Sequence, residues 1–482
     1  MDLATSLHPP GARSCPKALL RASMLSMAVL LSACATSPGP VAPDAGLAVP
    51  SGWSAAPAGH DADALAGWWA RMGDDTLNQL VGEALSGNTT VRAAQAAVRQ
   101  ARASLDVTRA SAGPSVNASG SAQRSKSGDN PASNRFQAGF DASWEPDLFG
   151  ANARAVDASQ ADARAAETTL ADARVSLAAE VAVTYIELRS LQQRLVIARR
   201  NLALQQETLQ ITRWRVQAGL ASSLDLEQSV AANEQTLAQI PALQAGVAQA
   251  IHALSVLTGQ APAHLQARLE TAAAIPQAPA SLALALPADT LRQRPDVRTA
   301  GLRVEAALAR RDQADAARYP SLRLSGSIGL SALTFSGLGS GATVANALLG
   351  GLSVPLFDGG AARARVEAQD AALEQARIAY QGAVLDALKE VEDALVSLRG
   401  NRERLARLQA AAEAAANAEL LARQRYGSGL IDFRSVLDTQ RTLLSAQDSV
   451  ASVQASLSAD HVRLYKALGG GWQPGAEPDP SR

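Results

Sequence analysis

The chain has 482 residues, of which 47% are hydrophobic but only 4% aromatic, and its formal net charge is −1 at pH 7. A charge this close to zero gives no indication of the basic surface that nucleic-acid binding requires. The low aromatic content is unusual for a large globular core, whereas the many Ala, Leu, Val, Gln, Arg and Glu residues are typical of long packed helices.

Residues 1–33 are predicted to be a signal peptide that is removed from the mature protein. Three basic residues precede the apolar run Met24–Leu31, which is shorter than the ~20 residues that a membrane-spanning helix needs. Small residues follow in Leu31-Ser32-Ala33, as they do before a secretory cleavage site, and Cys34 comes next. Cys15 lies in the removed segment, so no intrachain disulfide is possible.

The sequence Leu31-Ser-Ala-Cys34 resembles the bacterial lipobox, and this resemblance implies a diacylglycerol group and an N-acyl chain on Cys34. Such lipoproteins with Asp after the cysteine stay in the inner membrane, so Ala35 fits an outer-membrane destination. An ordinary signal peptide followed by a chance cysteine is the alternative. The stretch after the cysteine is rich in Pro, Gly and Ala, and residues 34–62 are expected to be a flexible linker.

An internal duplication determines the organisation of the rest of the chain. Val91–Gly120 aligns with Val297–Gly326 at an offset of 206 without a gap, and 12 of the 30 positions are identical. Further along, Arg215–Leu220 aligns with Arg425–Leu430 at an offset of 210. A self-similarity of this kind means that one structural module occurs twice. The predicted divisions are a first repeat over 63–265, a linker over 266–286, a second repeat over 287–470 and a flexible tail over 471–482.

Each repeat is predicted to hold a strand pair followed by a helical hairpin. In the first repeat, helices over Asp75–Gly87 and Asn88–Ala110 precede them, with Asn88 as an N-cap. Alternating residues then predict the strands. The run from Ala151 to Val216 contains no Pro or Gly and predicts one helix of roughly 100 Å. Pro241 predicts a kink or local unwinding in the returning helix. The expected strand pairs are 114–145 and 320–356, and the expected hairpins are 151–259 and 361–468.

Four strands per chain cannot close a barrel, and open strand edges are not tolerated in lipid. Either the strands stay outside the membrane or several copies share one barrel. Three copies would supply twelve strands, an even number within the range of outer-membrane barrels. Twelve helical segments would then continue into the periplasm, because helices this long cannot be contained in a bilayer. The residues alone therefore predict a lipid-anchored oligomeric tube.

Several motifs resemble those of the outer-membrane efflux protein family, in its lipoprotein branch that serves resistance–nodulation–division (RND) pumps. The first is the pair Trp68-Trp69. The others are Trp144-Glu-Pro-Asp-Leu-Phe-Gly150 at a strand-to-helix junction, Val354-Pro-Leu-Phe-Asp-Gly-Gly360 in the second repeat, and Arg425-Tyr-Gly-Ser-Gly-Leu430 with Val436-Leu-Asp-Thr-Gln440 near the hairpin tip. The resemblance implies an α+β membrane protein, a homotrimer with a shared 12-stranded outer-membrane β-barrel that continues into a 12-helix periplasmic α-barrel.

The resemblance also implies a function. The subunit would be the exit duct of a tripartite pump that exports drugs, metals or other small toxic compounds. Its partners would be two further copies, a periplasmic membrane-fusion adaptor protein, an inner-membrane RND transporter and outer-membrane lipid. No chemistry and no cofactor would be needed in this subunit, apart from the acyl chains on Cys34.

Two sets of residues are candidates at the periplasmic end. Gly219, Leu220, Gly429 and Leu430 lie at the hairpin tips, where glycine permits a positive φ and where the resemblance implies docking of the adaptor. By the same resemblance, three copies of Asp438 would form a carboxylate ring in the bore that favours cations. A solvated helix face is the alternative for Asp438.

The resemblance further implies that Asp225 and Tyr426 tie neighbouring hairpins together by a hydrogen bond at the gate. Two positions depart from the family pattern, since an acid is expected where Ser435 stands and a basic residue where Ile431 stands. The ring charge and the lock are therefore expected to differ from those of the family. At the other end of the helices, Trp144 and Phe149 are expected at the membrane interface, or packed at the strand–helix bend.

No catalytic constellation is found in the sequence. The five histidines have no second ligand at metal spacing, and there is no Gly-Lys-Ser/Thr phosphate loop. Two alternatives to efflux remain, namely the duct of a type I protein-secretion system and a pore-free, lipid-anchored coiled-coil spacer. The lipobox and the long linker favour efflux over secretion, and the alternating strands and Trp144 argue against a spacer.

Overall fold

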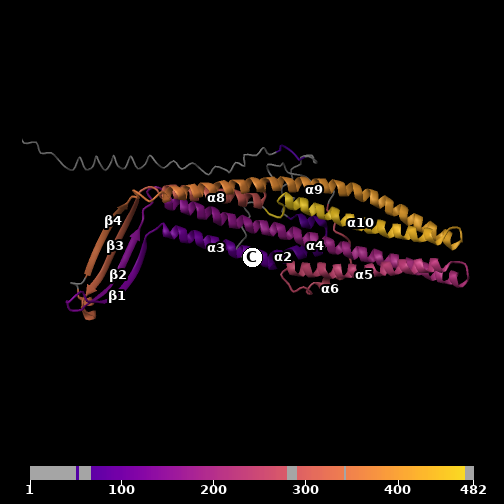
Figure 1. Cartoon of the computed structure of the whole chain (residues 1–482), viewed down its shortest axis with the longest axis horizontal. Helices are drawn as coiled ribbons and strands as arrows, with labels where there is room; N and C mark the ends of the chain where they lie inside the picture. The colour runs from indigo at the N-terminus through magenta and orange to yellow at the C-terminus, as the bar shows by residue number, and fades with distance from the viewer. Residues whose placement is uncertain (1–49, 54–66, 279–289, 292, 341–343, 473–482) are drawn as a thin grey trace, which may run out of the picture. The chain divides into compact units, whose positions relative to one another are not determined.

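The computed structural model describes residues 50–53, 67–278, 290–291, 293–340 and 344–472, which belong to one compact unit (Figure 1). The signal peptide, Cys34, most of the expected linker and the tail beyond residue 472 lie outside the described residues.

Three short helical elements open the described chain. They are η3 (Trp68–Met72), α2 (Asp75–Gly87) and α3 (Thr89–Ser111). The carboxylate of Asp74 accepts the Leu77 amide at 2.9 Å and so caps α2. The side-chain oxygen of Asn88 accepts the Thr90 amide at 2.8 Å, as expected of an N-cap residue.

The strands form a single antiparallel sheet in the order β1-β2-β3-β4. β2 pairs with β3 and thus joins the two repeats, with Phe140 opposite Ile328 and Gly139 opposite Gly329. The connection between β3 and β4 contains a 3₁₀ turn, η4 (Phe335–Gly339). The strand bounds are Ser115–Ser125, Ser133–Trp144, Ser321–Ala332 and Val344–Ser353.

Four helices make up the two hairpins. The long helices α4 (Ala151–Gln217) and α9 (Ala361–Gly427) each follow a strand pair, and α5 (Ser223–Leu257) and α10 (Phe433–Ala467) return from the tips. The tips lie at the end of the helices opposite the sheet (Figure 1). The expectation of long helices with four strands per chain is confirmed.

Helix α5 continues through Pro241, so the expected local unwinding is wrong. Proline lacks an amide hydrogen, and its ring disturbs only the preceding turn. Pro241 is exposed, so that turn can adjust toward solvent without losing buried contacts. Helix α5 is also long and apolar enough to cross a membrane by length and composition. It packs along α4 in the hairpin instead of standing alone.

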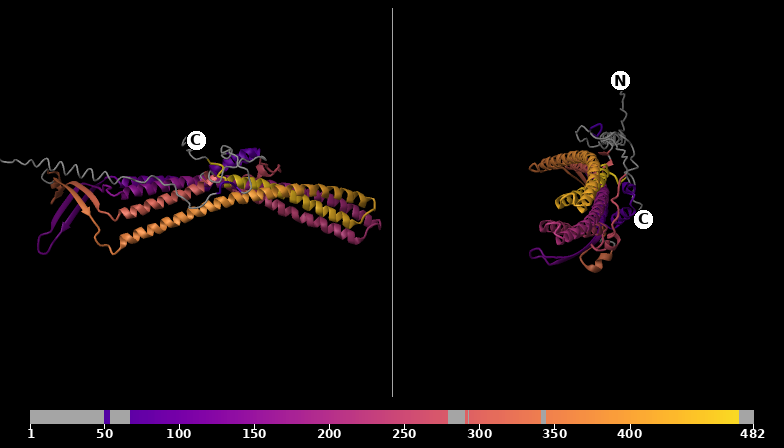
Figure 2. Two further views of the ribbon diagram at one scale, coloured as in Figure 1. Left: turned by 90° about the horizontal axis from the view of Figure 1, so that it is seen from above. Right: turned by 90° about the vertical axis from the view of Figure 1, so that its right-hand side faces the viewer.

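Two further helices flank the long ones (Figure 2). Helix α8 (Pro295–Ala316) packs against α4 and α9, just as α3 packs against α4. The short helix α6 (Gln266–Leu269) lies at the start of the stretch that the sequence assigned to a linker. Around the long helices, α3 and α8 therefore occupy corresponding places in the two repeats.

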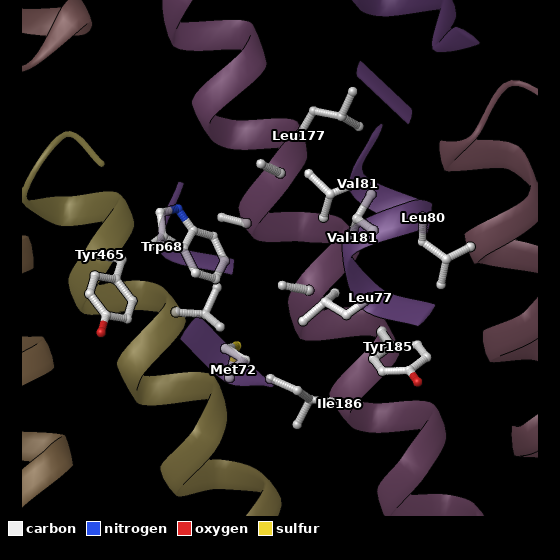
Figure 3. Close-up of a cluster of buried hydrophobic side chains, with 14 of the residues drawn as sticks. Trp68, Met72, Leu77, Leu80, Val81, Leu177, Val181, Tyr185, Ile186 and Tyr465 are labelled. Carbon is white, nitrogen blue, oxygen red and sulfur yellow. The ribbon is translucent and has the colours of Figure 1, made fainter. Parts of the chain in front are cut away.

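The main core lies where α2, α4 and α10 meet (Figure 3). Trp68 is fully buried and stacks on Tyr465, with ring centroids 5.4 Å apart. The Tyr185 hydroxyl donates to the Asp74 carboxylate at 2.9 Å and accepts from Arg189 at 2.8 Å. The N-terminal element η3 is therefore held to the C-terminal helix α10 by aromatic packing, which ties the two repeats together.

The buried His461 on α10 predicts that the fold loses stability in mild acid. Burial lowers the pKa of its imidazole, and nearby Arg402 lowers it further, against the opposing effects of the Leu457 carbonyl and Asp460. The neutral ring therefore favours the folded state. This contribution is complete above the unfolded-state pKa of about 6.5 and is lost as the pH falls from there through the folded-state pKa.

We expect the melting temperature of the wild type to fall more between pH 7.5 and pH 5.5 than that of His461→Gln, which cannot take up this proton. Thermal unfolding of the detergent-solubilised protein at the two pH values measures the difference. An equal fall in the two proteins would mean that His461 does not take up a proton on unfolding in this pH range. His252, whose side chain is exposed, provides the control variant His252→Gln.

Candidate functional site

The sheet has one apolar and one polar face. Residues paired across antiparallel strands share a face, so the register assigns every side chain to one side. Several large apolar side chains stand exposed on the first face, among them Phe140, Ile328 and Leu348, at 59%, 55% and 87%. The apolar face carries Val116, Ala118, Phe136, Ala138, Phe140, Ala142, Leu324, Ile328, Leu330, Val344, Leu348 and Leu352.

The opposite face of the sheet is mostly hydrophilic, although β4 places the exposed Leu349 on it, and it is hollow. Ser119 donates to the Asp141 carboxylate at 2.9 Å across β1 and β2. A groove of about 350 Å³ runs along this side, lined by Ser119, Gln137, Asp141 and Ser327 among others. One side of the sheet thus suits hydrocarbon, and the other suits water.

Both outer strands of the sheet have a free edge within the described chain. Neither β1 nor β4 pairs with any strand other than its inner neighbour. An edge beside an exposed apolar face cannot remain unpaired in a bilayer, because unsatisfied backbone groups there cost several kcal/mol each.

Trp144 and Phe149 lie at the junction between the sheet and the long helices. The indole Nε1 of Trp144 donates to the Ala112 carbonyl at 3.3 Å, and the ring of Phe149 stacks on Tyr319 with centroids 5.1 Å apart. Both side chains remain nearly half exposed, at 42% and 48%. They contact the bend and also present an aromatic surface beside the apolar face.

The two hairpin tips share one geometry. Gly219 and Gly429 have φ of 73° and 75°, and each allows the following leucine amide to donate to an arginine carbonyl five residues back, at 2.7 and 2.9 Å. Leu220 and Leu430 are 71% and 74% exposed. Each tip therefore ends in a tight turn that presents one solvent-exposed leucine.

The caps of the returning helices use the same two residue types in exchanged positions. In the first hairpin Ser222 is the N-cap, and its amide and hydroxyl both donate to the carboxylate of Asp225, at 3.0 and 2.8 Å. In the second hairpin Asp432 is the N-cap, and it accepts from the amide and hydroxyl of Ser435 at 2.9 and 2.6 Å. The Ser435 hydroxyl and amide lower the pKa of the Asp432 carboxyl. The resemblance to the family led us to expect an acidic residue at position 435, and the chain carries one three residues earlier, at Asp432.

Asp438 lies on the exposed side of α10, and its carboxylate approaches the Arg434 guanidinium at 3.9 Å. Most of both side chains is exposed, so the pair leaves the carboxylate open to water. The geometry is compatible with a charge that faces an aqueous bore.

The structure does not bring Asp225 and Tyr426 together within the chain. Asp225 is committed to its capping box, and the buried Tyr426 hydroxyl has no hydrogen-bond partner among the described residues. The tyrosine instead contacts Arg215, whose guanidinium lies 4.4 Å from the ring centroid and whose Nη1 donates to the Tyr426 carbonyl at 2.7 Å. Sequence reasoning missed Arg215. Its identity with Arg425 in the repeat alignment was the available signal.

No group of His, Cys, Asp or Glu residues suited to a metal ion is present in the described part of the chain.

Comparison with protein-family models matches residues 80–260 and 286–470 to the family described as outer membrane efflux protein. The chain is 33% identical over 470 residues to the pyoverdine export outer membrane protein OpmQ of Pseudomonas aeruginosa, which covers 94% of this chain and 97% of that protein. It is 32% identical over 447 residues to nodulation protein T of Rhizobium leguminosarum bv. viciae, which covers 92% of each.

Among solved structures, the outer-membrane channel OprN matches with a TM-score of 0.83 and 36% sequence identity, over 90% of this chain and 100% of that chain. The match includes the long helices and the sheet that carry the geometry described above. The chain therefore belongs to the outer membrane efflux protein family, and it is an outer-membrane channel of an efflux system and not an enzyme.

Proposed function

We propose that three copies of this chain form the exit duct of a tripartite pump that exports small molecules. The two-faced sheet with two free edges carries this proposal, because β4 of one copy can pair with β1 of the next until the ring closes. Three sheets would supply twelve strands, with the apolar faces toward lipid and the groove along Ser119 and Asp141 toward the bore.

The remaining parts of the proposal follow from this arrangement. Acyl chains on Cys34 anchor each copy in the outer membrane, and Trp144 and Phe149 lie at the periplasmic interface of the bilayer. The tips with Leu220 and Leu430 dock on a periplasmic adaptor, which links the duct to an inner-membrane RND transporter. Pyoverdine export by the similar protein OpmQ supports a cargo of small molecules and not of proteins.

We assign selectivity to the three copies of Asp438 near the tips. A ring of carboxylates attracts cations and repels anions. Single-channel recording in planar bilayers tests this with purified wild type, Asp438→Ala and the charge-retaining Asp438→Glu. We expect a cation-selective pore in wild type and Asp438→Glu, and a selectivity for cations over anions that is at least halved in Asp438→Ala.

Two results would contradict these statements separately. An unchanged selectivity in Asp438→Ala would remove Asp438 from the pore and leave the duct intact. A trimeric protein that forms no pore at any applied voltage would contradict the proposed trimeric duct.

A further inference from the structure

We propose that a cavity between α4, α5 and α10 binds a small organic acid that also carries an N–H or O–H donor and an apolar group. The cavity has a volume of about 560 Å³, within the roughly 300–1,000 Å³ of typical small-molecule sites. The three helices run side by side there and belong to both hairpins of the chain (Figure 1). One chain by itself thus supplies walls from three helices.

The cavity carries an excess of one positive charge. Arg194 and Asp448 neutralise each other, because Nε and Nη2 of the guanidinium donate to the two carboxylate oxygens at 2.7 and 3.1 Å. Arg441 of α10 also lines the cavity, and its side chain forms no hydrogen bond or ion pair within the described residues. The acid one turn before it, Asp438, approaches Arg434 instead. A free guanidinium binds a carboxylate through two parallel hydrogen bonds.

A buried amide lines the same cavity without a partner. Gln205 of α4 is only 5% exposed, and its Oε1 is buried with no hydrogen-bond partner among the described residues. An unpaired buried acceptor is costly, and an N–H or O–H group of a ligand would satisfy it. The cavity therefore offers a cation and an acceptor, which suit an acid and a donor on one molecule.

Much of the remaining wall is apolar. Leu243 of α5 and Leu444 of α10 are partly buried at the cavity, together with alanines of α4 and α5. A ligand with an aliphatic or aromatic group covers this surface and gains free energy by removing it from water. An inorganic anion would leave the leucines uncovered, so the lining favours an organic acid.

The helical hairpin does not itself require these polar side chains. At the repeat offset of 210, Ala231 corresponds to Arg441 and Ala415 corresponds to Gln205. The same module therefore folds with alanine at both positions. The free guanidinium and the unpaired amide are features of this one cavity and not of the hairpin architecture.

In the duct proposed above, the cavity would lie in the wall of the bore, and this statement alone rests on that proposal. Arg441 and Ser445 stand three and seven residues after Asp438, so they share its side of α10. Gln205 lies 14 residues before Gly219, which is roughly 20 Å along α4 from the tip. An acidic cargo molecule that has passed the Asp438 carboxylates would thus meet a compensating cation.

Binding of three probes to the purified, detergent-solubilised protein tests the site, with dissociation constants from saturation-transfer NMR. N-acetyl-leucine carries the acid, the donor and the apolar group. N-acetyl-leucinamide has the same shape without the charge, and 4-methylpentanoate lacks only the N–H donor. We expect N-acetyl-leucine to bind at least ten-fold more tightly than the amide and several-fold more tightly than 4-methylpentanoate. Equal binding of the acid and the amide would overturn the proposal.

Two variants assign the preferences to their residues. Arg441→Gln should abolish the preference for the acid over the amide. Gln205→Met should abolish the advantage of the N–H donor and change the binding of 4-methylpentanoate less than two-fold. Arg199→Gln is the matched control, because Arg199 is an exposed arginine of α4 outside the cavity. A control that weakens binding as much as Arg441→Gln would mean that overall charge, and not this site, attracts the acid.

A photoreactive probe locates the site in the unmodified protein. N-acetyl-photo-leucine, whose side chain carries a diazirine, should label peptides of α4, α5 and α10 around residues 198, 243 and 444. An excess of N-acetyl-leucine should protect those peptides. Label that is spread over the protein, or that the competitor does not reduce, would mean that the cavity holds only water. Protected label in a protein that forms no pore would keep the site and contradict the duct.

Discussion

Gly139→Ala is expected to cost about 3 kcal/mol of stability, roughly a 100-fold loss in the folding equilibrium, and to leave little assembled protein in the outer membrane. Gly139 lies opposite Gly329 in the middle of the β2–β3 pairing. A Cβ atom at position 139 would lie 2.8 Å from the Ile328 carbonyl oxygen and 2.9 Å from the Gly329 Cα. Both are backbone atoms, so the strands that join the two repeats would have to separate.

Gly326→Ala is the matched control for Gly139→Ala. Gly326 also lies on an inner strand, but a Cβ atom there would meet its nearest neighbours at 3.9 Å, an ordinary contact. We expect this variant to assemble like the wild type. Immunoblots of outer-membrane fractions and melting temperatures of the purified proteins measure both changes. Equal stability of the two variants would show that the close approach at Gly139 is absent in the assembled protein.

Arg294→Ala should destabilise the chain by about 1.5–3 kcal/mol, the range for losing hydrogen bonds to charged groups, because the two carboxylates left behind are partly exposed to water. The Arg294 side chain is 7% exposed and binds both Asp296 and Glu390 through Nη2, at 2.6 and 2.8 Å. Its Nη1 donates to the Ala467 carbonyl at 2.9 Å. One guanidinium therefore joins the start of α8 to α9 and to the end of α10.

The loss should also depend on pH. Burial by itself raises the pKa of Asp296, but the hydrogen bonds and charge of Arg294 outweigh it and lower the pKa below its usual value. The pair therefore stabilises the fold above the unfolded-state pKa of about 3.9, and this contribution disappears as the pH falls through the lowered value. Burial and the charge of Asp296 raise the pKa of nearby Asp172, whereas Lys466 and Arg294 lower it, so the variant removes one of the two cations that favour the ionised form of this third carboxyl.

Melting temperatures at pH 7 and near pH 3 test the Arg294 prediction, with Arg294→Lys as the control that keeps the charge. Lysine cannot reproduce the fork that reaches two carboxylates and a carbonyl, so an intermediate loss is expected. A loss in Arg294→Ala that is as large at pH 3 as at pH 7 would mean that unpaired carboxylates are not its cause.

Local signals in the sequence predicted the elements well. The Asn88 cap, the Pro-free and Gly-free run of α4 and the alternation of β1 and β2 each depend on neighbours within a few residues. The capping box of Ser222 and Asp225 is a local signal of the same kind, but the resemblance to the family directed Asp225 to a lock with Tyr426 instead. The structure shows that the Asp225 carboxylate instead accepts a hydrogen bond from the Ser222 hydroxyl in the helix cap.

Contacts between distant segments could not be predicted in this way. Nothing near Arg294 in the sequence indicates Glu390 or Ala467, because their approach depends on how α8, α9 and α10 pack. The close pairing of Gly139 with Gly329 likewise depends on the register between the repeats. Two glycines in separate strands carry no signal until that register is known.

The pairing of β2 with β3 also bears on the history of the chain. A half-length ancestor with one strand pair and one hairpin would offer one edge of each kind, and a ring of six such units would have six identical seams. In the duplicated chain, positions 207 and 417 are encoded separately, so an acidic residue can stand at one and an amide at the other. A duplicated gene can thus encode two different junctions in alternation around a ring, which six copies of a single shorter gene product cannot.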